Sequence, residues 1–138
     1  MLRTILGILL GFAAMWLVTA GIEFLSHAIY PPPAGLDPGV PEHLQIIIET
    51  APTGALLLLV CAWSAGAFAG GWTAARIARH PRVAATVVAM IVMAGVVGMI
   101  VIVPQHPRWV SIMGLLLPVP IALIAAQLAQ YREKTLPQ

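Results

Sequence analysis

Four long apolar runs dominate the chain, and short polar segments separate them. An α-helix rises about 1.5 Å per residue, so a helix of about 20 apolar residues crosses the ~30 Å hydrocarbon core of a bilayer. Each run has about this length, and none carries a charged residue in its central part. We therefore predict an all-α integral membrane protein built as a four-helix bundle. The predicted spans are residues 2–22, 51–75, 83–103 and 109–127.

The composition agrees with a lipid environment. Hydrophobic residues make up 60% of the 138 positions and charged residues 9%, whereas soluble domains average about 45–50% and about 25%. A chain this short is expected to form a single domain, residues 1–138. The net charge of +2 does not indicate a nucleic-acid partner, because the cations lie at predicted helix ends. The single cysteine, Cys61, is expected to be a small buried apolar residue of the second run.

The cationic residues predict a topology. If the four spans alternate in direction, six Lys and Arg residues fall on one side and only Arg108 falls on the other. The six are Arg3, Arg76, Arg79, Arg82, Arg132 and Lys134. The positive-inside rule assigns their side to the cytoplasm. Both termini are therefore expected in the cytoplasm, and the loop of residues 23–50 is expected outside.

The first run admits a second interpretation. A short basic start, an apolar stretch and the sequence Val18-Thr19-Ala20 loosely match a cleavable signal peptide. The apolar run continues past that point without a break and is long enough to span. We therefore expect it to be retained as the first span.

Small residues recur every four positions in the first two runs. Helices in lipid associate through close backbone approach and van der Waals packing, which small residues permit. Positions four apart lie on one face of a helix, so the second run is expected to be the central helix. The predicted packing residues are Gly7, Gly11, Ala62, Gly66, Gly70 and Ala74. Ala94 and Gly98 repeat the spacing in the third run, which lacks polar groups and is expected to be a lipid-facing or filler helix.

Prolines shape the remaining segments. The three prolines at 31–33 predict extended, polyproline-like chain in the outer loop. Residues 42–49 (EHLQIIIE) predict a short helix at the outer membrane surface or over the mouth of the bundle. Pro118 and Pro120 remove backbone donors inside the fourth run, so we expect a kink or a short unwound segment there.

The outer ends of the first two runs carry the candidate chemistry. Glu23 and His27 are four residues apart and share a face on a continuing helix, where His27 or Arg108 is expected to pair with the glutamate. Glu49 arrives at the matching end of the second run, and His43 precedes it in the loop. Three interpretations stay open. The cluster is a structural hydrogen-bond or ion-pair network, a substrate or proton site of Glu23, His27 and Glu49, or a divalent-metal site of His27, His43 and Glu49.

Two stretches resemble a known group of proteins. Residues 21–33 (GIEFLSHAIYPPP), followed by AGLDP, and residues 52–78 (PTGALLLLVCAWSAGAFAGGWTAARIA) resemble an uncharacterised family of short four-helix bacterial inner-membrane proteins. The resemblance implies a bacterial plasma membrane and transfers no site residue. A looser likeness to the small multidrug resistance transporters lies in the four helices and in one glutamate of helix one. Glu23 departs from that pattern because it lies near the predicted membrane edge.

These observations favour a transporter-like or accessory membrane module with the Glu/His cluster as its polar focus. Catalysis is not expected, since the chain lacks Gly-x-Ser-x-Gly, His-Glu-x-x-His and phosphate-loop motifs. One alternative is a membrane-embedded metal-binding protein or enzyme that uses the same cluster. Another is a structural subunit that docks through the small-residue face of the second span. The expected partners are the lipid bilayer and a second copy or another membrane protein, and no cofactor is expected apart from the divalent metal of the first alternative.

Overall fold

The computed structural model describes residues 1–37, 39–103 and 107–135, which form helices and connecting segments without a strand. The helices are α1 (Leu2–Ile29), α2 (Pro41–Thr50), α3 (Thr53–Ile77), α4 (Pro81–Ile102), α5 (Arg108–Leu116) and α6 (Pro118–Thr135). Four segments are long and apolar enough to cross a membrane, namely α1, α3, α4 and the stretch Arg108–Tyr131 that joins α5 to α6. The prediction of an all-α chain with four membrane spans is confirmed.

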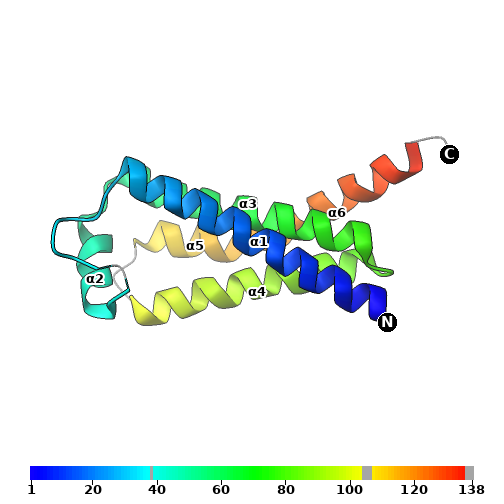
Figure 1. The fold of residues 1–138 in the computed structure, drawn as a ribbon, viewed down its shortest axis with the longest axis horizontal. Helices are drawn as coiled ribbons and strands as arrows, with labels where there is room; N and C mark the ends of the chain where they lie inside the picture. The colour runs from blue at the N-terminus through cyan, green and yellow to red at the C-terminus, as the bar shows by residue number, and fades with distance from the viewer. Residues whose placement is uncertain (38, 104–106, 136–138) are drawn as a thin grey trace.

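The spans alternate in direction along the long axis of the molecule. Both termini and the turn between α3 and α4 lie at one end, which we call the terminal end (Figure 1). Helix α2 lies at the opposite end, which we call the α2 end. Arg3 and Arg79 therefore share the terminal end, whereas Arg108 begins α5 at the α2 end. This arrangement separates the cations as four alternating spans require.

Helix α3 is the central helix among those described, since its contacts with α1, α4 and α6 are the most extensive and it carries more buried residues than α1, α4 or α5. Its closest partner is α1, and small residues set the approach. A Cβ on Gly11 would lie 2.7 Å from the Gly70 carbonyl oxygen, and a Cβ on Gly7 would lie 2.9 Å from the Ala74 carbonyl oxygen. No side chain fits at such distances, so the two backbones are in contact.

The contact between α1 and α3 repeats every four residues, in opposite directions on the two helices. Gly11 meets Gly70 and Ala74, and Met15 meets Gly66 and Gly70. The Thr19 hydroxyl then donates to the Ala62 carbonyl oxygen at 3.3 Å. We call this contact the α1–α3 seam, which is formed by Gly7, Gly11, Met15 and Thr19 with Ala62, Gly66, Gly70, Ala74 and Ala78.

The seam occupies the small-residue face of α3 within the chain itself. Ala62 and Ala74 are both 0% exposed, and Gly66 and Gly70 are buried. In this structure α1 therefore covers the small-residue face of α3. The repeat at Ala94 and Gly98 behaves differently. A Cβ on Gly98 would meet nothing within 4 Å, so this repeat does not mark a packed face of α4.

The structure differs from the predictions at Cys61, which is exposed and not buried, and at the end of the first span. Helix α1 does not end at residue 22 but continues through Glu23 and His27 to Ile29, because the chain meets no helix breaker before Pro31. Its 28 residues extend about 42 Å, beyond the ~30 Å of hydrocarbon. The predicted kink in the fourth span is confirmed: α5 ends at Leu116, and α6 begins at the buried Pro118.

Candidate functional site

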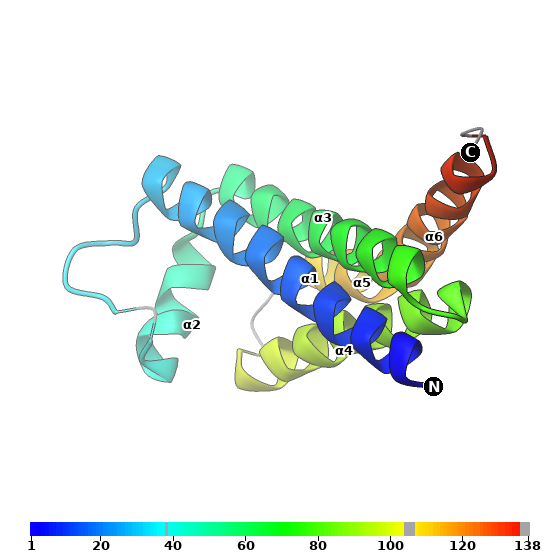
Figure 2. The same ribbon diagram turned by 45° about the vertical axis from the view of Figure 1, so that its right-hand side comes forward.

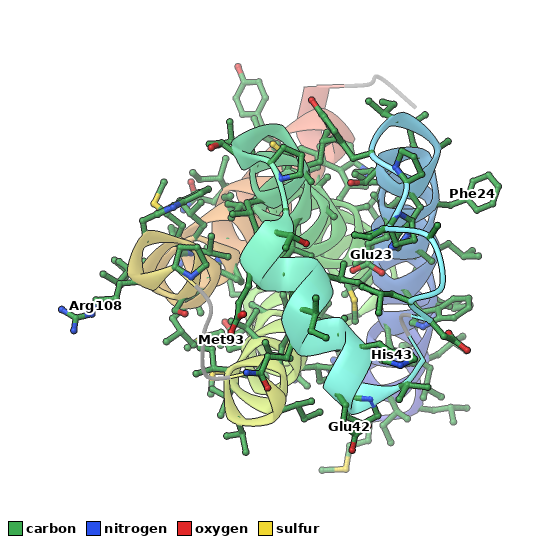
Figure 3. All side chains as sticks on the ribbon, turned by 90° about the vertical axis from the view of Figure 1, so that its left-hand side faces the viewer. Glu23, Phe24, Glu42, His43, Met93 and Arg108 are labelled. Atoms are coloured by element: carbon green, nitrogen blue, oxygen red, sulfur yellow. The ribbon has the colours of Figure 1, made fainter. Side chains whose placement is uncertain are left out.

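The α2 end of the bundle contains a cavity. Helices α1 and α4 lie close together near the terminal end and diverge towards the α2 end (Figures 1 and 2). Seen along the bundle from that end, α2 crosses in front of the other helices (Figure 3). The side chains between these elements enclose a cavity of about 390 Å³, which α1, the proline-rich loop, α2, α3 and Met99 of α4 line. We call it the capped cavity, and its volume suits a small-molecule ligand.

Most polar side chains of the capped cavity come from one face of α1. Ser26, His27 and Tyr30 lie three, four and seven residues after Glu23, which is the spacing of a single helix face. Thr50 also lines the cavity, but its hydroxyl already donates to the Ile46 carbonyl oxygen at 2.7 Å. The apolar walls include Ile47, Ile48, Leu56, Leu59 and Met99, and the described lining residues include no Lys or Arg. The cavity is therefore apolar with one acidic edge.

Glu23 is the acidic group of this edge. Its side chain is half-buried and lies on the side of α1 that faces the bundle, behind α2, whereas the neighbouring Phe24 points away (Figure 3). His27 follows one turn later on the same helix and also lines the cavity. Arg108, the other expected partner, points outward on the far side of the bundle end (Figure 3). His27, and not Arg108, is therefore the neighbour of Glu23 in the structure.

Glu49 and His43 do not join this pair, because neither lines the capped cavity. Glu49 is exposed, and its Oε1 accepts a hydrogen bond from Gln45 Nε2 at 3.3 Å. His43 Nδ1 accepts the backbone N–H of Asp37 at 3.0 Å and so braces the loop before α2. The proposed substrate or proton set is thus reduced to two neighbours, Glu23 and His27.

The expected metal ligands His27, His43 and Glu49 are likewise not brought together. Among residues 1–37, 39–103 and 107–131, whose side chains the structure describes, no three His, Cys, Asp or Glu residues gather closely enough to hold a metal ion. Each of the three side chains instead makes a different contact. His27 lines the cavity, His43 braces the loop and Glu49 pairs with Gln45.

Sequence reasoning missed Ser26, Tyr30 and Met99 as cavity-lining residues. Ser26 and Tyr30 could have been found, because they lie three and seven residues after Glu23 and so share its helix face. Tyr30 also sits where a Cβ on Gly54 would collide with its hydroxyl, so the glycine makes room for it at the start of α3. Met99 comes from another helix, and no local pattern signals its position.

Comparison of the chain with protein-family models, with curated proteins and with solved structures gave no match. The four long apolar segments of the described residues are compatible with a small multi-pass membrane protein.

Proposed function

We propose that the protein binds a small ligand in the capped cavity through a cationic group, as a transporter-like or accessory module of the membrane. The observation that carries the proposal is the half-buried Glu23 carboxylate in a lining whose described residues include no Lys or Arg. Removing a carboxylate from water is costly unless a partner of opposite charge compensates it. A ligand cation inside the cavity supplies such a partner beside the exposed His27, while the apolar walls accommodate the rest of a small organic molecule.

The proposed orientation places the capped cavity on the outer side of a bacterial inner membrane, with both termini in the cytoplasm. Its support is the distribution of charge, because Arg3, Arg76, Arg79 and Arg82 lie towards the terminal end and the positive-inside rule assigns such an end to the cytoplasm. In this orientation the proline-rich loop and α2 form an outer cap, with α2 as a surface helix over the mouth. The resemblance of residues 21–33 and 52–78 to short bacterial inner-membrane proteins supports the same location.

Three probes of one shape and different charge test the proposal, namely benzylammonium, benzyl alcohol and benzoate. Binding to the purified full chain in lipid nanodiscs is measured by isothermal titration calorimetry. We expect benzylammonium to bind most tightly, because only the cation complements Glu23. A hydrogen bond to a charged group contributes about 1.5–3 kcal/mol, so Glu23→Gln should weaken benzylammonium about 10- to 100-fold.

Glu42→Gln is the matched control. Glu42 is an exposed carboxylate at the start of α2 that does not line the capped cavity, so its loss should leave the affinity unchanged. Equal binding of benzoate and benzylammonium, no binding of any of the three probes, or full affinity in Glu23→Gln would each overturn the proposal.

A further inference from the structure

Helix α4 carries a second hollow, on the outside of the bundle. A shallow open groove of about 510 Å³ runs along its outward face, and all of its lining residues belong to α4. Val83 is 58% exposed and Met90 54% exposed, so these walls face the surroundings of the bundle. The groove shares no residue with the capped cavity. A ligand of this groove is therefore independent of the ligand proposed for the capped cavity.

The groove has one charged end and an apolar body. Arg82 lies at its terminal end, and the lining continues through Val83, Val87 and Met90 to Ala94. Thr86 also lines the groove, but its hydroxyl already donates to the Arg82 carbonyl oxygen at 2.9 Å. From residue 82 to residue 94 a helix rises about 18 Å, which is close to the ~15 Å depth of one leaflet of the hydrocarbon core.

The charge around Arg82 points to an anionic occupant. Arg82 is exposed, and Arg3, Arg76 and Arg79 also lie towards the terminal end. Arg76 is held over the Trp72 ring, 5.7 Å from its centroid. Among the residues whose side chains the structure describes, every Asp and Glu lies towards the α2 end, in α1, α2 or the loop between them. None of these described acids lies near Arg82, and an anionic headgroup at the membrane surface complements its charge.

We propose that this groove binds one anionic phospholipid. The lipid phosphate lies at Arg82, and one acyl chain lies along α4 from Val83 to Ala94. Charge and length act together in this arrangement. Arg82 selects an anionic headgroup, and the apolar groove holds a chain whose reach equals one leaflet.

Native mass spectrometry of the purified full chain tests the proposal by counting retained lipids. Phosphatidylglycerol is compared with phosphatidylcholine of the same acyl chains. An Arg near an anionic surface contributes enough for about a fivefold preference, so wild-type protein should retain phosphatidylglycerol about fivefold better. Arg82→Gln should abolish that preference, and Ala94→Trp, which fills the groove, should reduce retention of both lipids.

Two matched controls distinguish a specific lipid site from a general effect of surface charge or side-chain bulk on lipid retention. Arg79→Gln removes an exposed cation near the same end, and Val97→Trp adds bulk to an exposed position of α4 outside the groove. Both should retain lipid as wild type does. Inorganic phosphate should not displace the lipid, because it has no acyl chain.

Several results would overturn the lipid site. They are equal retention of the two lipids by wild-type protein, a loss in Arg79→Gln equal to that in Arg82→Gln, or displacement by inorganic phosphate. Far-UV circular dichroism shows whether each variant keeps its helices. If Arg82→Gln fails to fold, the comparison of the two lipids on wild-type protein still decides the outcome.

Discussion

Adding a single methyl group at Gly70 should separate α1 from α3. A Cβ at this position would lie 2.7 Å from Met15 Cβ, 2.7 Å from Val88 Cγ1 and 2.8 Å from the Gly11 carbonyl oxygen. A Cβ atom and a backbone oxygen cannot rotate away as the end of a long side chain can. Relief therefore requires α1 to move as a unit, which loosens the whole α1–α3 seam.

The expected magnitude comes from a comparison with Gly98→Ala. In a helix interior, Gly→Ala gains about 1 kcal/mol of helix propensity, and this gain is common to both variants. Overpacking costs about 1–3 kcal/mol and applies only at Gly70, since a Cβ at Gly98 meets nothing within 4 Å. The difference in the free energy of unfolding between the two variants should therefore be about 1–3 kcal/mol, with Gly70→Ala the less stable.

The assay is reversible unfolding of the purified protein by dodecyl sulfate in mixed micelles, followed by far-UV circular dichroism. A second variant sharpens it. A Cβ on Gly11 would lie 2.7 Å from the Gly70 carbonyl oxygen, so Gly11→Ala and Gly70→Ala push the same two helices apart. The double variant should lose less stability than the sum of the single variants, because α1 has already moved. If Gly70→Ala and Gly98→Ala unfold at the same dodecyl sulfate fraction, the backbone contact of the seam does not exist.

Two further perturbations test other parts of the fold. Pro118→Ala restores a backbone N–H that can donate to the Gly114 carbonyl oxygen, so the bend between α5 and α6 should straighten. The distance between spin labels at the exposed Ile112 and Leu128 should then increase. An unchanged distance would mean that packing, and not the missing hydrogen bond, causes the bend. His43→Ala removes the acceptor of the Asp37 N–H. Hydrogen exchange at the Asp37 amide should therefore accelerate, while the amides of the bundle helices keep their protection. Equal exchange in wild type and variant would exclude the hydrogen bond between Asp37 and His43.

Most of the helical framework could be predicted from hydropathy, because a bilayer requires long apolar segments whose backbone groups bond internally. The errors lie at the helix ends. A bilayer sets the length of the apolar part but not the length of the helix, and nothing in the chain stops α1 between Ile22 and Ile29. The break at Pro118 was predictable, since proline removes a donor wherever it stands inside a helix.

The candidate site was only partly predictable, and the reason is geometric. Glu23 and His27 share one helix, so their spacing alone places them on one face. Glu49 belongs to α2, and where its side chain points depends on how that helix lies across the bundle. No spacing along the chain contains that information. The structure turns Ile47 and Ile48 of α2 into the cavity and leaves Glu49 exposed.

Helix α1 carries its packing residues and its polar residues on one continuous row of every fourth position, from Gly7 through Thr19 to Glu23 and His27. Turning α1 about its axis by one residue, about 100°, would drive the bulk of Phe12 against Gly70 and swing Glu23 out of the cavity. Gly7 and Gly11 thus fix the rotation of α1 about its own axis. They set the direction of the Glu23 carboxylate, which lies about 18 Å farther along the same helix than Gly11. A change in the packing of α1 against α3 would therefore change where the negative charge of Glu23 points.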